Sequence, residues 1–390
     1  MKLSNVWLAG ERVDLQLADG RIASRAPTAG GPLGGTVCPP LAEPHVHLDA
    51  ALLGRRAPNR SGTLVEGIAN WAALRDSLDG DDVRARALET VSWYVGWGCT
   101  RIRTHVDTGN LRAVEALVAL RDELAAAAIP VELQVVAFPQ EGILRAPGRQ
   151  RDWEAAVDLG CDAVGAIPHF ERTADEGNAS LRLALDLARE RGLFVDVHCD
   201  ETDDPGSRHL EVLCAEAMDR GMGDRVVAGH CTAMHSYPDP HAAKVIELVA
   251  QSGVQVVCNP LDNIVLQGRY GGYPKIRGLT RVDQLQARGC PVGIGHDSVV
   301  DPWYRLGTAN LVDAAYMLVH AGHLTGEAEM EAVFGALSGA NHLPFGGAPG
   351  LEVGDVASLL IYPADDAIEV LRLRPRPRLI LAGVDVSPPA

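Results

Sequence analysis

Eight short apolar runs recur along the middle of the chain, and amphipathic segments separate them. The runs cover residues 35–49, 100–107, 131–142, 163–170, 194–201, 225–235, 254–260 and 291–297. Stretches between them, such as DDVRARALETVSWYVGW and ASLRLALDLARERG, place apolar residues at i, i+3 and i+4, as in a helix that packs on one face. Most runs begin about 30 residues after the previous one, which is typical of repeated strand–helix units. Eight such units predict a closed (β/α)8 barrel.

A doubly wound open sheet is the alternative arrangement of the same units. Such a sheet often carries a glycine-rich phosphate loop after its first strand, and none follows residues 35–49. We therefore expect a barrel over residues 39–344. Residues 1–38 and 345–390 instead carry short alternating runs and turn signals, with no long helical period. We expect the two ends to form one small β-sandwich domain; two unrelated peripheral tails are the alternative.

The composition restricts the partners. A net charge of −16 opposes binding to nucleic acid or to an anionic membrane, so the expected ligand is a small molecule. The N-terminal stretch MKLSNVWLAGERVDL lacks the apolar region of a signal peptide, and charges interrupt the chain too often for a membrane span. The eight cysteines form no CxxC pair, which disfavours a disulfide framework or a zinc–thiolate site. We expect a reduced, cytoplasmic protein.

Polar residues gather where the predicted strands end. His45 and His47 lie two residues apart at the end of the first strand, so both imidazoles point to the same side. An HxH pair alone is a weak signal, and so is a single histidine such as His198. Together with Asp297 at the end of the eighth strand, however, they form a set of three nitrogens and one oxygen, which suits one Fe(II) or Zn(II) ion. Such an ion supplies hydroxide near neutral pH.

Three further polar residues belong to the same predicted face. Glu201 ends the fifth strand and His230 ends the sixth. Asp49 follows the HxH pair and is either a partner of a metal ligand or a turn cap. Active sites of barrels lie at the C-terminal ends of the strands, so these side chains are candidates for acid–base chemistry beside the metal.

Several segments resemble the amidohydrolase superfamily and, within it, the bacterial cytosine deaminases. The similar segments include VVAFPQEGIL, VGAIPHFE, VDVHCDETDD, GHCTAMHSY, NPLDNIVLQGRY and DPWYRLGTAN, and they extend over nearly the whole chain. The resemblance implies a barrel with a sandwich built from both termini, one catalytic metal, and hydrolytic deamination of an amino-azine ring. It also implies a homo-oligomer.

The resemblance assigns roles to individual residues. The implied metal ligands are His45, His47, His198 and Asp297. Glu201 matches the acid that moves a proton to the ring nitrogen, His230 matches the histidine that orients or deprotonates the attacking water, and Asp297 shares that work. Gln140 matches the amide that hydrogen-bonds the pyrimidine edge, or it caps a strand end. Trp303 and Tyr304 pack either on the pocket wall or outside the site.

Lysine content bears on the number of metals. Binuclear amidohydrolases usually bridge two ions through a modified lysine on the fourth strand, and the run AVGAIPHF has none. The three lysines of the chain are Lys2, Lys244 and Lys275, and none falls in a predicted barrel strand. The composition predicts a mononuclear site. His169, in the same run, is either a neighbour of the metal or a packed residue.

Ser298 departs from the pattern of the cytosine deaminases, which typically carry a second aspartate after the metal-binding one. A serine there removes a charge and frees space for an apolar group, which favours 5-methylcytosine over cytosine as substrate. Neutral drift in an ordinary cytosine deaminase is the alternative. Isoguanine, creatinine or an aminotriazine are other possible substrates, and a cyclic-amide hydrolase or a non-catalytic metal-binding barrel are the remaining hypotheses. The long loop after the first strand is an active-site lid, a subunit contact or an inert loop.

Overall fold

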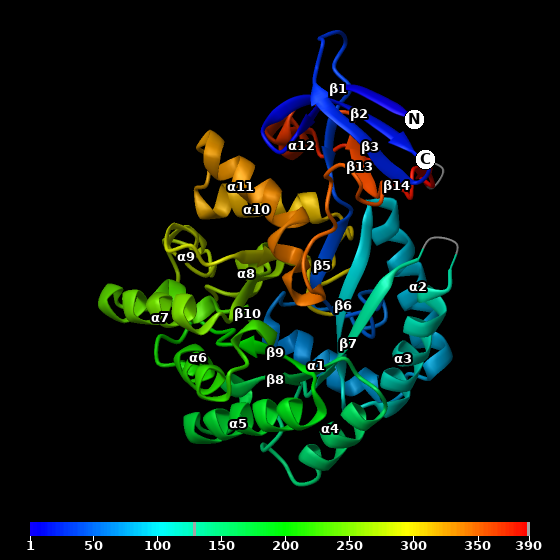
Figure 1. The fold of residues 1–390 in the computed structure, drawn as a ribbon. Helices are drawn as coiled ribbons and strands as arrows, with labels where there is room; N and C mark the ends of the chain where they lie inside the picture. The colour runs from blue at the N-terminus through cyan, green and yellow to red at the C-terminus, as the bar shows by residue number, and fades with distance from the viewer. Residues whose placement is uncertain (128–129, 388–390) are drawn as a thin grey trace.

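Eight parallel strands form the barrel in the computed structural model, which describes residues 1–127 and 130–387 (Figure 1). In chain order the strands are β5 (Leu41–Val46), β6 (Cys99–Asp107), β7 (Glu132–Phe138), β8 (Ala163–Ala166), β9 (Phe194–Cys199), β10 (Val226–His230), β11 (Gln255–Cys258) and β12 (Val292–Ile294). Each pairs with the next. A parallel bridge from Val46 to Asp297 closes the ring between the first strand and the segment after the last. The predicted barrel is confirmed.

Helices cover the outside of the barrel (Figure 1). They are α1 (Leu64–Arg75), α2 (Gly80–Gly96), α3 (Leu111–Ala125), α4 (Arg149–Asp158), α5 (Ala174–Arg191), α6 (His209–Arg220), α7 (Asp239–Ser252), α8 (Pro260–Leu266), α9 (Val282–Ala287), α10 (Leu311–Gly322) and α11 (Glu327–Ser338). Short 3-10 turns are η1 (Pro168–Phe170), η2 (Gly223–Arg225), η3 (Thr232–Ser236) and η4 (Ala340–Phe345). None of the described helices is both long and apolar enough to cross a membrane.

Helix α5 illustrates how the sequence sets these elements. The Thr173 side chain caps its N-terminus by accepting a hydrogen bond from the Glu176 amide. Leu181, Ala184 and their helical neighbours form a buried face against the barrel. Gly192, with φ of 71°, ends the helix in a left-handed conformation that glycine adopts without strain.

The two chain ends share one seven-stranded sheet. Its strands are β1 (Lys2–Leu8), β2 (Glu11–Ala18), β3 (Arg21–Pro27), β4 (Thr36–Cys38), β13 (Leu359–Tyr362), β14 (Arg378–Leu381) and β15 (Val384–Asp385), in the order β15-β14-β13-β4-β1-β2-β3. Val6, Leu15, Ile22 and Ile380 belong to its own hydrophobic core. The joint packing of both ends is confirmed, whereas the domain boundaries at residues 38 and 345 stay predictions.

Two segments differ from the sequence interpretation. The predicted first run is two strands, because β4 belongs to the terminal sheet and β5 to the barrel, with Pro39 and Pro40 between them. Proline has no amide hydrogen for a ladder, so the strand is interrupted there. The C-terminal segment shows short β runs and no long helical period in the sequence, but Ala367–Leu373 is the seven-residue helix α12. Asp366 caps it, and the buried Ala367, Val370 and Leu371 repeat at helical spacing.

Candidate active site

A pocket opens at the C-terminal ends of the barrel strands. Its lining residues come from strand ends, from α1 and α8, and from the loop after β12: His47, Leu64, Gln140, His198, Glu201, His230, Asp262, Leu266, Asp297, Ser298 and Trp303. The sequence-predicted site residues therefore meet in one place. His45 lies beside this pocket, fully buried, and is the only predicted metal ligand that does not line it.

The four predicted metal ligands converge at the seam of the barrel. Nε2 of His47 lies 3.1 Å from Nε2 of His198, and Oδ1 of Asp297 lies 3.6 Å from Nε2 of His45 and 3.5 Å from Nε2 of His47. The Asp297 amide donates to the His45 carbonyl at 2.9 Å. The backbone hydrogen bonds that close the barrel thus also fix three of the four side chains relative to one another.

These imidazoles are neutral, which is the form that binds metal. Burial and mutual repulsion among the histidines lower the pKa of His45 and His198 well below the usual value, and burial has the same effect on His47. Both ring nitrogens of His45 and Nδ1 of His198 are buried without a hydrogen-bond partner. Buried polar atoms are rarely left unpaired, so this donor set fits a divalent cation.

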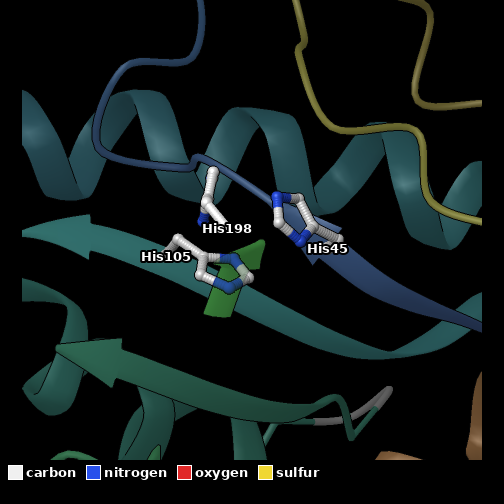
Figure 2. A group of neighbouring side chains, drawn as sticks. All are labelled: His45, His105 and His198. Carbon is white, nitrogen blue, oxygen red and sulfur yellow. The ribbon is translucent and has the colours of Figure 1, made fainter. Parts of the chain in front are cut away.

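His105 is a fifth member of the cluster that the sequence interpretation missed. Its ring lies 4.0 Å from that of His45, and His45, His105 and His198 are close enough to form a second possible metal-binding group (Figure 2). However, Nε2 of His105 lies 3.1 Å from Oδ1 of the buried Asp196. The signal was present in RIRTHVD, where Arg103 and His105 occur at strand period two and both point into the barrel.

Asp196 lies next to His105 and forms a buried ion pair with Arg103. Arg103 is fully buried and donates to Asp196 Oδ2 at 3.0 Å and to Gln134 Oε1 at 2.6 Å and 2.9 Å. The Asp196 carboxyl is therefore hydrogen-bonded to the guanidinium, whereas its Oδ1 lies close to His105 Nε2 without a hydrogen bond between them. Asp196 thus lies between His105 and Arg103 inside the barrel.

Glu201 and His230 stand beside the predicted metal ligands. Burial raises the pKa of Glu201 to about 8, so this carboxyl is protonated at neutral pH. Nδ1 of His230 lies 3.7 Å from Glu201 Oε1 and 3.9 Å from Asp297 Oδ2, and the Asn263 amide contacts it at 3.1 Å. His230 and Asp297 both adopt left-handed backbones, with φ of 67° and 68°. Such conformations in non-glycine residues cluster at functional sites.

Helix α1 covers part of the pocket from the loop after β5. Leu64, in its first turn, lines the pocket. Gly67 lies against the Trp303 indole so closely that a β-carbon there would come within 2.5 Å of Trp303 Cδ1. The structure therefore places this segment over the pocket, and Trp303 lies between the helix and His47, whose ring is 5.7 Å away. Tyr304 does not line the pocket.

Ser298 lines the pocket as predicted, but a second carboxyl group lies directly beside it in the pocket wall. Its hydroxyl donates to Oδ2 of Asp262 at 2.5 Å. Asp262 is buried, and burial together with the neighbouring Asp301 raises its pKa well above the usual value. The sequence interpretation missed Asp262, because a single aspartate in NPLDNIVLQGRY carries no pattern that distinguishes it from a helix cap.

The structure also places the residues whose roles were left open. The Asp49 carboxylate accepts from the amides of Ala50 and Asp107, both at 2.9 Å, so it joins two strand ends as a cap. The His169 ring lies outside the pocket lining, and its Nδ1 is buried without a hydrogen-bond partner. β8 contains no lysine, and Lys244 lies in α7, 3.1 Å from Glu211.

The sequence and the fold of this chain are similar to those of known proteins. A model described as the amidohydrolase family matches residues 75–376. The chain belongs to the amidohydrolase family. The structure of 5-methylcytosine deaminase from Klebsiella pneumoniae, liganded with 5-fluorocytosine, is 37% identical and superimposes with a TM-score of 0.92 over 99% of this chain and 96% of that one.

Two other relatives extend the comparison. Pterin deaminase from Rhizobium rhizogenes is 27% identical over 387 residues, which cover 95% of this chain and 86% of that protein. N-isopropylammelide isopropylaminohydrolase from Burkholderia multivorans shares the fold, with a TM-score of 0.82, 24% identity, and 99% and 97% of the two chains covered. With the histidine-rich centre, these findings identify the chain as a metal-dependent hydrolytic deaminase, as the sequence predicted.

Proposed function

We propose that the protein deaminates cytosine or a 5-substituted cytosine, with 5-methylcytosine to thymine and ammonia as the first reaction to test. The observation that carries the proposal is the position of the buried Glu201 carboxyl in the same pocket as the histidines and Asp297, where burial raises its pKa. A deaminase needs an acid that is still protonated at neutral pH to deliver a proton to the ring. The 37% identity to 5-methylcytosine deaminase over almost the whole of both chains supports the choice of ring.

His45, His47, His198 and Asp297 would hold one divalent ion, Fe(II) or Zn(II). When bound, such an ion acts as a Lewis acid that makes water nucleophilic near neutral pH. The remaining chemistry belongs to the side chains. Glu201 donates its proton to the ring nitrogen next to the amino-bearing carbon while water adds to that carbon. The water proton passes to Asp297 or His230, which lie within 3.9 Å of each other. A second proton transfer to the amino group releases ammonia.

Gln140 and Trp303 would position the ring. Gln140 follows β7, where its side-chain amide can hydrogen-bond the N–H and C=O edge of a pyrimidine, and its side chain is 7% exposed in the pocket. Trp303 supplies an aromatic surface on the side covered by α1. The Ser298 side chain is shorter than an aspartate, which leaves room for a 5-substituent on the ring.

An ammonia-release screen of the Fe(II)- or Zn(II)-loaded protein tests the proposal. Cytosine and 5-methylcytosine are compared with isoguanine, creatinine and substituted aminotriazines. A pterin is included because one relative is named a pterin deaminase. We expect the pyrimidines to have the highest kcat/KM. Higher turnover of another ring would assign the protein to that amino-azine instead. Ring opening without ammonia would indicate a cyclic-amide hydrolase, and no turnover of any ring would leave a metal-binding barrel.

A further inference from the structure

The pocket contains a carboxyl group that the proposed reaction does not use. Asp262 belongs to α8, is 1% exposed and lines the pocket beside Ser298. Its Oδ2 accepts the Ser298 hydroxyl at 2.5 Å, but its Oδ1 is buried and has no hydrogen-bond partner. A buried carboxyl oxygen without a donor costs stability, so a group retained in this state at a binding pocket points to a donor on the ligand.

The position of Asp262 indicates which edge of the ring it faces. Gln140 follows β7 and Asp262 follows β11, the third and seventh of the eight barrel strands. Strands four apart in an eight-stranded barrel lie on opposite sides, so the two side chains approach the pocket from opposite walls. If Gln140 bonds the edge around C2, Asp262 and Ser298 face the opposite edge, which carries C5.

We propose that the 5-substituent that this wall selects ends in a hydrogen-bond donor, as in a hydroxymethyl or aminomethyl group. The inference rests on the proposed cytosine deaminase function. A methyl group would fill the space beside Ser298 but would leave Asp262 Oδ1 unpaired in a pocket from which the ring excludes water. A hydroxymethyl group fills the same space and donates to that oxygen. In either protonation state, the Asp262 carboxyl keeps an oxygen that can accept.

The surroundings of Asp262 leave this acceptor to the ligand. The neighbouring acid, Asp301, uses Oδ1 to accept from the amides of Trp303 and Tyr304, and its Oδ2 has no hydrogen-bond partner, so no hydrogen bond joins it to Asp262 Oδ1. Leu266, one turn further along α8, is apolar.

The predicted reaction is 5-hydroxymethylcytosine plus water to 5-hydroxymethyluracil plus ammonia, in which the C–N bond breaks and no oxidant or reductant is needed.

The test is the ratio of kcat/KM for 5-hydroxymethylcytosine to that for 5-methylcytosine. We expect a ratio above one in the metal-loaded wild-type protein and a decrease of about tenfold or more in Asp262→Leu, the scale of one hydrogen bond to a carboxylate. Val265→Ala changes the same helix at a residue outside the pocket lining, so its ratio should match the wild type. Metal content and circular dichroism check that each variant is folded and loaded.

Two further outcomes distinguish a failure of this inference from a failure of the proposed function. If Asp262→Leu does not fold, Asp262→Asn preserves the size of the side chain and should lower the same ratio by a smaller factor. A wild-type ratio below one, or a ratio that is unchanged in a folded Asp262 variant, would overturn the inference while cytosine turnover kept the proposed function intact. Absence of ammonia release from every cytosine would instead overturn the proposed function.

Discussion

The two sides of the pocket are built from different parts of the barrel. On the metal side, His45 and His198 lie on β5 and β9, and the Asp297 amide is hydrogen-bonded to the His45 carbonyl across the barrel seam. On the substrate side, Gln140, Asp262 and Trp303 lie on connections after strands, where side-chain contacts rather than ladders hold them. Groups on strands are held rigidly, whereas loops vary with little cost to the fold. We therefore expect the strand residues to determine the reaction and the residues after the strands to determine the substrate.

Removal of a strand-mounted ligand should have the largest effect. We expect His198→Ala to lose the metal and to lower kcat/KM by at least about 10³-fold, because the Lewis acid contributes several kcal/mol to the transition state. Elemental analysis and ammonia release measure the two quantities.

His105→Asn is the matched control for the ligand assignment. His105 lies in the same cluster but contacts Asp196, so this variant should retain metal with affinity reduced by no more than about 10- to 100-fold, the range for residues that support ligands. If His105→Asn loses the metal while His47→Asn keeps it, the group of His45, His105 and His198 is the true site.

Glu201→Gln separates the proton donor from the metal. The amide keeps the shape of the side chain but has no acidic proton, so we expect full metal content and a loss of about 10²- to 10⁴-fold in kcat. Rapid mixing with substrate followed by ammonia detection measures the loss. A fully active variant would show that another group protonates the ring.

The pH dependence of the reaction should report the same carboxyl. Burial raises the pKa of Glu201 from 4.5 to about 8, so the protonated form that the reaction needs is present below that pH. As pH rises through about 8 the proton is lost, and kcat/KM should fall about tenfold for each further pH unit. The metal ion favours the ionised form and would move this limb to lower pH. A rate that keeps rising through this range contradicts the acid role.

The proximity of the four proposed metal ligands could be predicted from the sequence, whereas the wall around Ser298 could be predicted only in part. Strand periodicity and the HxH spacing place His45 and His47 on one face, and the position of Asp297 follows from the order of the strands. His105 follows the same periodicity, but it lies inside the run of residues 100–107 and was not recognised as a site residue. Asp262 could not be predicted, because its contact with Ser298 joins residues 36 positions apart, one in α8 and one in the loop after β12. No local pattern encodes that contact.

The smallest expected effect concerns Ser298 itself. Ser298→Asp places a longer acid against Asp262 in a buried wall that also contains Asp301, so the new side chain must occupy the space of a 5-substituent. We expect the ratio of kcat/KM for 5-methylcytosine to that for cytosine to fall by about tenfold, on the scale of rejecting one methyl group. Ser298→Asn has nearly the same volume without the charge. If both variants lower the ratio equally, space alone excludes the methyl group, whereas a larger effect of the aspartate adds repulsion within the acidic wall. An unchanged ratio in both variants would show that Ser298 does not determine the specificity, and Asp262 would then be the residue to test for that role.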